Sequence, residues 1–324
     1  MTDGVLPART GRSTRPLLAS LVGVNTMMQA RDALWGYVFL LPWIIGLVVF
    51  FLGPIILSFL LSFTKYDVIT PPQFVGLANY ETAFTGDDLF WPSLWRTFEY
   101  SIVVVPVGLF GSLLLALMLN RGLPGTGFFR TAFFLSTLTP AVALALLWSW
   151  ILNPDIGPIN VALRAIGIPG PGWLADVHWA LPSVILINLW GSMGGNTMLI
   201  FLAGLQGVPQ ELYEAAAIDG ASGWARFRHV TLPMISPTFF FNLVLGVIGA
   251  LKVFTTAFVV TGGNGGPNYA LWFFALHIYQ QAFSFFKMGY ASALAWIFVV
   301  ILLAFTYFQV VLSRRWVYYA GGDE

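Results

Sequence analysis

The side chains best placed to do chemistry are polar groups set inside long apolar stretches. Lys252 is the one clear charge within such a stretch, and a lysine at the centre of a membrane helix costs at least about 2.5 to 3.5 kcal/mol. At 100° per residue, Asn242, Gly246, Gly249 and Thr256 fall on one helical side, with Lys252 at its edge. A charge kept at that cost usually faces a cavity or a partner, although a lysine can also snorkel toward the membrane surface.

A second group of polar and small side chains lies earlier in the chain. Asn188, Gly191, Ser192 and Gly195 again share one helical side. Glycines let helices approach closely, and amides or hydroxyls either bond across the helices or line a polar path between them. Both interpretations stay open for the two asparagines and for Thr256.

Residue patterns for catalysis or metal binding are missing from the sequence. No Gly-Lys pair occurs, so there is no phosphate-binding loop for ATP. There is no HExxH or GxSxG motif, and His178, His229 and His277 lie far apart with no ligand spacing. We therefore expect no catalytic residue, no metal site and no bound cofactor, and any uphill work must be driven by a partner.

The composition indicates a membrane protein. Of the 324 residues, 58% are hydrophobic and only 9% are charged, against about 25% charged in soluble domains. So few charges cannot solubilise that much apolar surface, so the bilayer must be the solvent. The net charge of +1 without a basic run argues against nucleic acid, and the absence of cysteine excludes disulfides.

Six apolar stretches are each close to the roughly 20 residues that cross a bilayer. They are Trp35–Phe63, Tyr100–Asn120, Thr131–Leu152, Leu181–Leu205, Pro237–Thr261 and Tyr290–Leu312. The connecting segments Lys65–Glu99, Asn153–Ala180 and Gly262–Gly289 are expected to be loops on the outer side. The excess of arginine in the remaining segments places both termini, and the segment 209–237, in the cytoplasm.

The domain organisation follows from these spans. Residues 1–34 are expected to form a cytoplasmic tail, 35–313 the membrane domain and 314–324 a second cytoplasmic tail. The apolar run at residues 17–28 is too short to span. It resembles a signal-peptide core or a surface helix, and we expect no cleavage because a full span follows.

A polar island, residues 209–237, separates two of the spans. Pro209 suits the start of a helix, and Glu211 and Glu214 suit the positive end of its dipole. Gly220 offers a left-handed stop, and a second short helix is expected from about Gly223 to residue 229. A helix so rich in alanine can seat closely in a groove of another protein.

This segment resembles the EAA loop of ABC importer permeases. Glu214-Ala215-Ala216, Gly220 and the run from Val230 to Pro233 keep its spacing, and only Val230 departs from the usual isoleucine. In that family the loop is a coupling helix that docks on the cytoplasmic ATPase. The resemblance implies an ATPase-coupling surface of Glu211, Leu212, Glu214, Ala215, Ala216, Asp219, Gly220, Leu232 and Pro233. If the segment is not such a coupling helix, the alternative interpretation is a short interfacial helix between two spans.

Further motifs are similar to the MalF-like, carbohydrate-uptake branch of these permeases. They are Phe133-Phe134-Leu135, Asn153-Pro154, Lys252-Val253-Phe254, Thr261-Gly262-Gly263 and Met288 to Ala293. Within that branch the chain resembles the six-span subunits of trehalose, lactose and glycerol-phosphate systems. The family often has an acidic residue where Thr255 stands, which leaves the pairing of Lys252 open.

The resemblance implies an all-α membrane protein with six transmembrane helices, a cytoplasmic coupling-helix loop and the MetI-like permease fold. It implies a second homologous permease, two ATPase subunits that use ATP and Mg²⁺, and an extracytoplasmic solute-binding protein (a lipoprotein or periplasmic), in a bacterial or archaeal cytoplasmic membrane. The expected cargo is a di- or oligosaccharide such as trehalose, or a glycerol-phosphate-type solute. The alternative function for the chain is a stand-alone secondary transporter or channel for a small polar solute.

The substrate path is expected to combine an aromatic side chain with polar ones. Trp190, with Trp148 and Trp150, can stack on sugar faces, although tryptophan is also a common anchor at the membrane interface. The complete predicted path consists of Asn188, Trp190, Ser192, Asn242, Lys252, Thr255 and Thr256.

Overall fold

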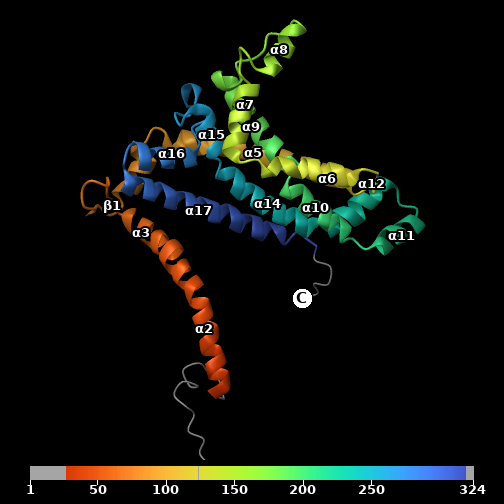
Figure 1. The fold of residues 1–324 in the computed structure, drawn as a ribbon, viewed down its shortest axis with the longest axis horizontal. Helices are drawn as coiled ribbons and strands as arrows, with labels where there is room; N and C mark the ends of the chain where they lie inside the picture. Colours follow the sequence, from red (N-terminus) through yellow and green to blue (C-terminus); the bar gives the residue numbers. More distant parts are fainter. Residues whose placement is uncertain (1–26, 123, 319–324) are drawn as a thin grey trace, which may run out of the picture. The chain divides into compact units, whose positions relative to one another are not determined.

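The computed structural model describes residues 27–122 and 124–318. Its secondary structure there is helical apart from two short strands, β1 (Thr64–Lys65) and β2 (Gln73–Phe74), which pair antiparallel with Thr64 opposite Phe74. Long apolar helices dominate (Figure 1). The predicted all-α membrane class is therefore confirmed.

The chain forms two units, and the first ends at Leu60. In it α2 (Met27–Leu47), η1 (Val48–Leu52) and α3 (Gly53–Leu61) follow one another without a break, and residues Arg31–Leu61 are long and apolar enough to cross a membrane. Pro54 explains the π-helical turn η1, because proline has no N–H to donate and its ring crowds the carbonyl four residues earlier. The N–H of Gly53 accordingly bonds to the Val48 carbonyl, five residues back.

The first span begins earlier than the sequence predicts. Helix α2 starts at Met27, and the stretch long and apolar enough to cross a membrane begins at Arg31, four residues before the predicted Trp35. The expected surface helix at residues 17–28 and most of the N-terminal tail lie outside the described residues, as do residues 319–324 of the C-terminal tail.

Three more candidate spans lie in the second unit. They are Phe90–Leu119, which is α5, Ser236–Thr261, which contains α14 (Ser236–Leu251) and α15 (Thr255–Thr261), and Met288–Ser313, which is α17. Two bent helix pairs complete the set. In the first pair, α6 (Thr126–Leu135) and the short η3 (Ser136–Leu138) are followed by α7 (Ala141–Ile151). In the second pair, α9 (Val177–Met193) is followed by α10 (Asn196–Gln206). The described residues thus contain four helical stretches long and apolar enough to cross a membrane, or up to six if each bent pair is one span, in agreement with the predicted six.

Each bend has a local cause. The first pair bends by 97° at Pro140, because the residue before a proline is pushed out of the helical region, and Thr139 is indeed extended with ψ 123°. The second pair bends by 42° at Gly194–Gly195, where Gly195 has φ −93° and ψ −142°. The predicted span Thr131–Leu152 includes Pro140, and in the structure the helix ends before this proline and a new one begins after it.

The expected outer loops are largely structured. The first contains α4 (Ala78–Glu81) and η2 (Thr82–Gly86), and α5 already begins at Phe90, so the prediction of a loop to Glu99 is wrong. The second contains α8 (Pro158–Ala165) and η4 (Trp173–Ala175). The third contains η6 (Pro267–Tyr269), α16 (Phe274–Tyr279) and η7 (Gln280–Ser284).

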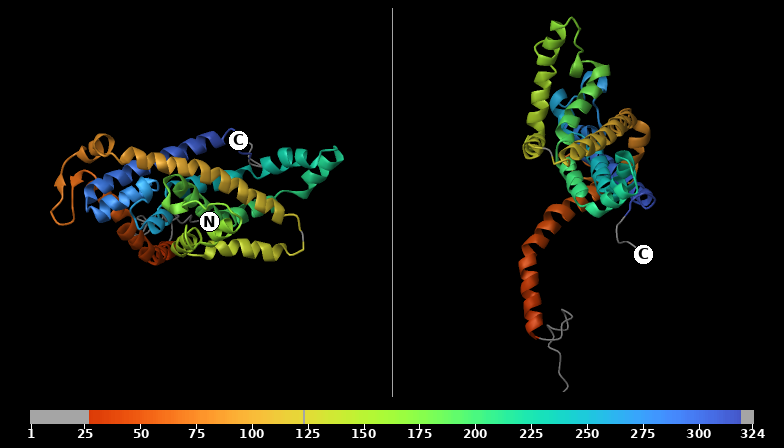
Figure 2. Two further views of the ribbon diagram at one scale, coloured as in Figure 1. Left: turned by 90° about the horizontal axis from the view of Figure 1, so that it is seen from above. Right: turned by 90° about the vertical axis from the view of Figure 1, so that its right-hand side faces the viewer.

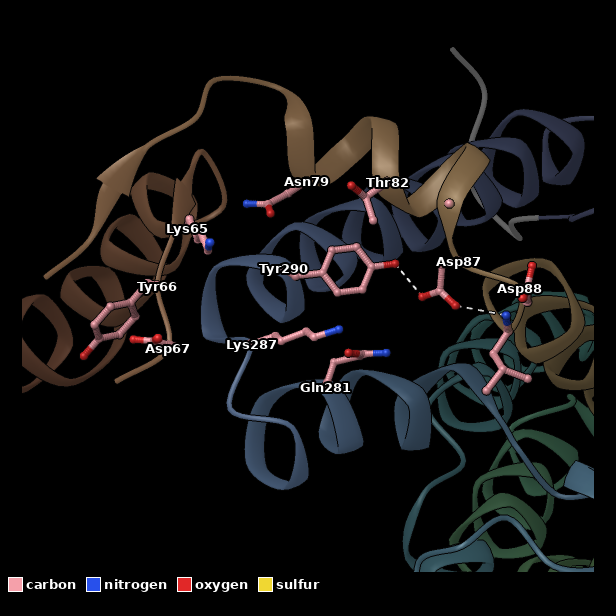
Figure 3. Close-up of a pocket in the computed structure, with 12 residues that line it drawn as sticks. Lys65, Tyr66, Asp67, Asn79, Thr82, Asp87, Asp88, Gln281, Lys287 and Tyr290 are labelled. Carbon is pink, nitrogen blue, oxygen red and sulfur yellow. Dashed lines mark hydrogen bonds between the residues drawn. The ribbon is translucent and has the colours of Figure 1, made fainter. Parts of the chain in front are cut away.

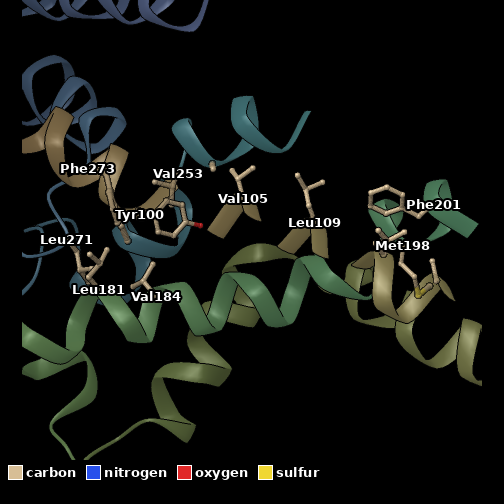
Figure 4. Packing of buried hydrophobic residues seen from close by; sticks show 14 of the residues in the cluster. Tyr100, Val105, Leu109, Leu181, Val184, Met198, Phe201, Val253, Leu271 and Phe273 are labelled. Carbon is tan, nitrogen blue, oxygen red and sulfur yellow. The ribbon is translucent and has the colours of Figure 1, made fainter. Parts of the chain in front are cut away.

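Helix α5 is the centre of packing in the second unit, because it contacts α9, α10, α14 and α16. Its buried side chains Tyr100, Val105 and Leu109 join Val184 of α9 and Phe201 of α10 in one apolar core (Figure 4). Because lipid tails are as apolar as these side chains, close van der Waals packing rather than removal from water holds the helices together here. This core holds the long helices at fixed spacing, and the polar residues described next are mounted on them.

The two ends of these helices carry different structures. The short helices of the 209–237 segment lie at one end, and the β1–β2 hairpin with α16 lies at the other (Figures 1 and 2). The hairpin is the orange segment and the 209–237 segment the teal one in both figures. Sites at the two ends are therefore separated by the length of the spans.

Candidate functional site

The first helix of the 209–237 segment is built as its sequence predicts. Helix α11 spans Gln210–Ile218 with Pro209 at its N-cap. It ends in a Schellman motif, in which the Ala221 N–H bonds to the Ala216 carbonyl and the Gly220 N–H to the Ala217 carbonyl. Gly220 has φ +75°, so the predicted left-handed stop is confirmed.

The rest of the segment turns the chain back toward the spans. It contains α12 (Gly223–Arg226), the π-helical turn η5 (Phe227–Thr231) and α13 (Leu232–Met234). Ser222 caps α12 by accepting a hydrogen bond from the Ala225 N–H at 3.3 Å. The predicted second helix is therefore present, and π-helical geometry replaces α-helix over its second half.

Large apolar side chains of this segment face solvent. Ile218 is 87% exposed, Trp224 69% and Leu232 46%. The acidic residues Glu211 and Glu214 are also exposed. Exposed large apolar side chains close to charged ones are common in surfaces that bind other proteins.

One side-chain contact links the two arms of the segment. The hydroxyls of Tyr213 on α11 and Thr231 on η5 share a hydrogen bond of 2.9 Å, and Thr231 is buried. At its base, Ser236 donates to the Pro233 carbonyl and accepts from the Tyr318 N–H. Sequence reasoning missed Tyr213 and Thr231, because a pair 18 residues apart leaves no local pattern.

A polar cavity of about 240 Å³ lies among α5, α9, α10 and α14. Three of the predicted path residues line it, namely Asn188, Ser192 and Asn242. Tyr100 and Ser112 of α5 and Thr197 of α10 line it as well. The sequence analysis missed the last three, since each is a single polar side chain within an apolar helix.

The two asparagines of this cavity differ in their bonding. Asn188 donates to the Val184 carbonyl at 2.9 Å and accepts from the Thr256 hydroxyl at 3.1 Å. Asn242 is 3% exposed, and its Nδ2 has no partner among the described residues. A buried donor without a partner is costly, so Asn242, a residue of the cavity lining, has an unused hydrogen-bonding group.

The remaining predicted path residues lie elsewhere. Helix α14 ends at Leu251, and the Lys252 side chain lines a separate apolar cleft with residues of α16 and α17 such as Ile278 and Thr306. The expectation that Lys252 borders the Asn242 side is therefore wrong, because the helix breaks at residues 252–254 and the 100° periodicity no longer holds. Thr255, the first residue of α15, lines neither space.

Trp190 belongs to an aromatic pair rather than to the cavity lining. It is 61% exposed, and its ring centroid lies 5.8 Å from that of Trp148 on α7 in an edge-to-face arrangement. The pair presents an aromatic surface beside the cavity helices. Trp150 is also exposed.

A buried acid–imidazole network lies at the opposite end from α11. Nε2 of His277 lies 2.8 Å from Oδ2 of Asp87, and the Tyr290 hydroxyl donates to the same oxygen. The Trp272 indole N–H donates to Nδ1 of His277 at 3.0 Å. Because an indole can only donate, Nδ1 must be the unprotonated nitrogen, and Nε2 therefore donates to Asp87.

This network keeps the carboxylate ionised. Burial by itself would raise the pKa of Asp87, but hydrogen bonds from His277, Tyr290 and the Leu89 N–H lower it from 3.8 to about 2. The network ties the segment before α5 to α16 and α17. No sequence pattern could reveal it, because Asp87 and His277 are 190 residues apart. In the described part of the chain no group of three or more His, Asp or Glu residues could hold a metal ion.

The comparisons with known proteins agree with this architecture. A family model described as "Binding-protein-dependent transport system inner membrane component" matches residues 108–318, which include the 209–237 segment. The probable ABC transporter permease protein YesP of Bacillus subtilis is 41% identical over 308 residues, covering 93% of this chain and 99% of that protein. The arabinooligosaccharides transport system permease protein AraP of the same organism is 35% identical over 316 residues, covering 95% and 97%.

A solved structure shows the same fold. One chain of a bacterial alginate ABC transporter, in complex with an alginate pentasaccharide-bound periplasmic protein, matches with a TM-score of 0.79 at 25% identity. The match covers 89% of this chain and 96% of that one. The fold and the match together define a multi-pass, all-helical protein of the inner membrane, of the ABC permease class.

The chain belongs to the family of binding-protein-dependent transport system inner membrane components. It is the permease of such a system and not its catalytic subunit. The predicted resemblance to ABC importer permeases is thus confirmed. The roles of the individual residues stay predictions.

Proposed function

We propose that this chain is the translocation subunit of an ATP-driven importer that carries a di- or oligosaccharide into the cytoplasm. The observation that carries the proposal is the 209–237 segment, which stands at one end of the spans with its apolar side chains exposed, in a chain of this permease family. The names of an arabinooligosaccharide permease and an alginate transporter among the similar proteins support a saccharide as cargo.

The 209–237 segment is the coupling surface in this proposal. The exposed Leu212 and Ile218 of α11 and the Trp224 ring of α12 would be covered by a cytoplasmic ATPase subunit, which buries apolar area that water now contacts. Two such subunits bind ATP and Mg²⁺, and this chain binds neither. The contact residues are Glu211, Leu212, Glu214, Ala215, Ala216, Asp219, Gly220, Leu232 and Pro233.

The cavity among α5, α9, α10 and α14 is the solute path in this proposal. Saccharide hydroxyls both donate and accept, so they can satisfy the free Nδ2 of Asn242 and bond to Ser192 and Tyr100. The Trp148–Trp190 pair, of which Trp190 is exposed, would supply an apolar face for the sugar C–H groups. Lys252 and Thr255 would act outside this cavity, in contact with a partner or at the membrane surface.

The proposed assembly has three kinds of companion subunit. A second homologous permease completes the path, and an extracytoplasmic solute-binding protein delivers the sugar. Both termini and the coupling segment lie in the cytoplasm of a bacterial or archaeal cell, with residues 35–313 as the membrane domain. Rocking of the spans between inward and outward openings, driven by ATP-dependent closure of the ATPases, would move the solute.

The test is purification of the tagged chain in mild detergent together with its companions. Glu214→Lys should remove the ATPase from the purified complex and abolish saccharide uptake, because it reverses charge at the centre of the proposed contact. Glu81→Lys, an equal change of an exposed residue on α4, should leave both unchanged. Normal uptake by the Glu214→Lys variant, at a normal amount in the membrane, would contradict the proposal.

A further inference from the structure

A second polar pocket, of about 530 Å³, lies at the end of the second unit opposite the coupling segment. Its walls come from β1 and the following turn, from α4 and η2, and from η7 and the start of α17. It shares no lining residue with the cavity of Asn188 and Asn242. Its volume is within the range of sites that hold small organic ligands.

Gln281 gives this pocket an unused hydrogen-bonding group. The residue is 9% exposed, and its Oε1 is buried with no partner among the described residues. Its backbone carbonyl accepts from the Lys287 N–H at 2.8 Å, which ties the backbone of the two pocket residues together. In Figure 3 Gln281 and Lys287 extend toward the side on which Asp87 lies. Buried amide oxygens nearly always have a partner, so this one is suited to accept from a ligand.

The pocket lining carries charges of both signs. Lys65 and Lys287 line it, and within the described residues neither has an ion pair. Asp67, Asp87 and Asp88 supply three carboxylates, of which Asp87 accepts from His277 and Tyr290 and Asp67 accepts from Thr70. Two positive and three negative groups leave the lining with one net negative charge, which disfavours an anionic ligand. The lining offers donors and acceptors together, which suits a neutral ligand with many hydroxyls.

The pocket wall is rigid before any ligand binds. The hydrogen bonds from His277 and Tyr290 to Asp87 join three segments that are far apart in the sequence. Gly289 adds a second tie, because its N–H donates to the Tyr66 carbonyl and a Cβ at this position would collide with the Thr64 carbonyl oxygen. A preformed wall lowers the entropic cost of binding.

We propose that this pocket is a second saccharide site, which holds a neutral sugar unit through Gln281, Lys65 and Lys287. The inference rests on the proposed import of saccharides. With the coupling segment in the cytoplasm, the pocket opens at the outer end of the spans, where the solute arrives. The chain thus holds a sugar at this outer site as well as in the central cavity.

The experiment is photolabelling of the whole transporter complex in lipid nanodiscs. Diazirine derivatives of trehalose, lactose and arabinotriose serve as neutral probes and a mannuronate trisaccharide as the acidic one. Peptide mass mapping should find the label of at least one neutral probe in residues 65–89 or 281–290. Gln281→Leu and Lys287→Met should each lower that labelling by about tenfold, the effect of roughly one lost hydrogen bond to a charged or buried group.

The matched control is Gln73→Leu, an exposed residue of β2 outside the pocket, which should label as the wild type does. No neutral label in these peptides, or stronger labelling by the acidic probe, would overturn the proposal. Uptake measured on the same sample separates the two claims. Normal saccharide uptake without labelling of the outer pocket would contradict only the proposed second site. Labelling of the outer pocket without uptake of any neutral sugar would contradict the proposed import and would leave the second site supported.

Discussion

The hydroxyls of Tyr213 and Thr231 lie 2.9 Å apart and join the two arms of the coupling segment. Thr231 is 5% exposed, whereas α11 on the other side of the bond faces solvent. A force applied to α11 by a docked subunit can therefore reach η5, α13 and the start of α14 through this bond as well as through the backbone. The link makes the segment behave as one body.

Removal of one partner of this bond should impair coupling. Tyr213→Phe leaves the buried Thr231 hydroxyl without a partner, at a cost of about 1 to 3 kcal/mol, and should lower uptake per ATP hydrolysed several-fold at a normal amount in the membrane. The double variant Tyr213→Phe with Thr231→Val removes both polar groups and should recover part of the stability. An uptake-to-ATPase ratio unchanged in Tyr213→Phe would show that the bond carries no force.

The left-handed conformation of Gly220 predicts a second effect. Gly220→Val places a β-branched residue at φ +75°, which costs about 1 to 2 kcal/mol. No atom lies within 4 Å of its added Cβ, so any effect must come from the backbone. We expect loss of the ATPase from the purified complex. Gly223→Ala is the matched control, because that position also has open space and no positive φ.

The two asparagines of the central cavity should respond differently to the same substitution. Asn242→Leu removes a donor that has no partner, so thermal stability in detergent should be unchanged or higher while saccharide affinity falls. Asn188→Leu leaves the Thr256 hydroxyl without its acceptor and should lower stability by about 1 to 3 kcal/mol. Equal stability losses in the two variants would contradict the bonding described here.

The acid–imidazole network predicts a pH dependence. The folded pKa of Asp87, at about 2, is below its ordinary value of 3.8. A depressed pKa stabilises the fold above pH 3.8, and this stabilisation is lost as the pH falls toward 2. The difference in melting temperature between the wild type and Asp87→Asn should therefore be constant above about pH 5 and shrink below pH 4. A difference that does not change across this window would mean that the carboxylate is not held ionised by its neighbours.

Local features of this molecule could be predicted from sequence and long-range ones could not. The spans, α11 and the stop at Gly220 are set by apolar length and by one residue's backbone freedom, which a sequence displays directly. The bend at Pro140 was not predicted, because a hydropathy profile gives the length of an apolar stretch and does not show whether one helix continues through it. Lys252 was misplaced for the same reason, since a helical side has meaning only while the helix is unbroken.

The polar contacts between distant segments left no trace in the sequence. Asp87 and His277 meet only because α16 folds back against the start of α5, and Gln281 becomes buried by the same packing. The sequence analysis treated His277 only as a histidine without ligand spacing. Such sites require the tertiary fold.

The central claim is that this chain is driven from the cytoplasm through the 209–237 segment and has no energy source of its own. The direct measurement is saccharide accumulation in proteoliposomes that contain the chain and its partner permease, with the solute-binding protein, with and without the ATPase subunits and internal ATP. We predict accumulation against the gradient only when both the ATPase and ATP are present, and none with the Glu214→Lys variant. Accumulation by the permeases alone, without nucleotide, would contradict the account.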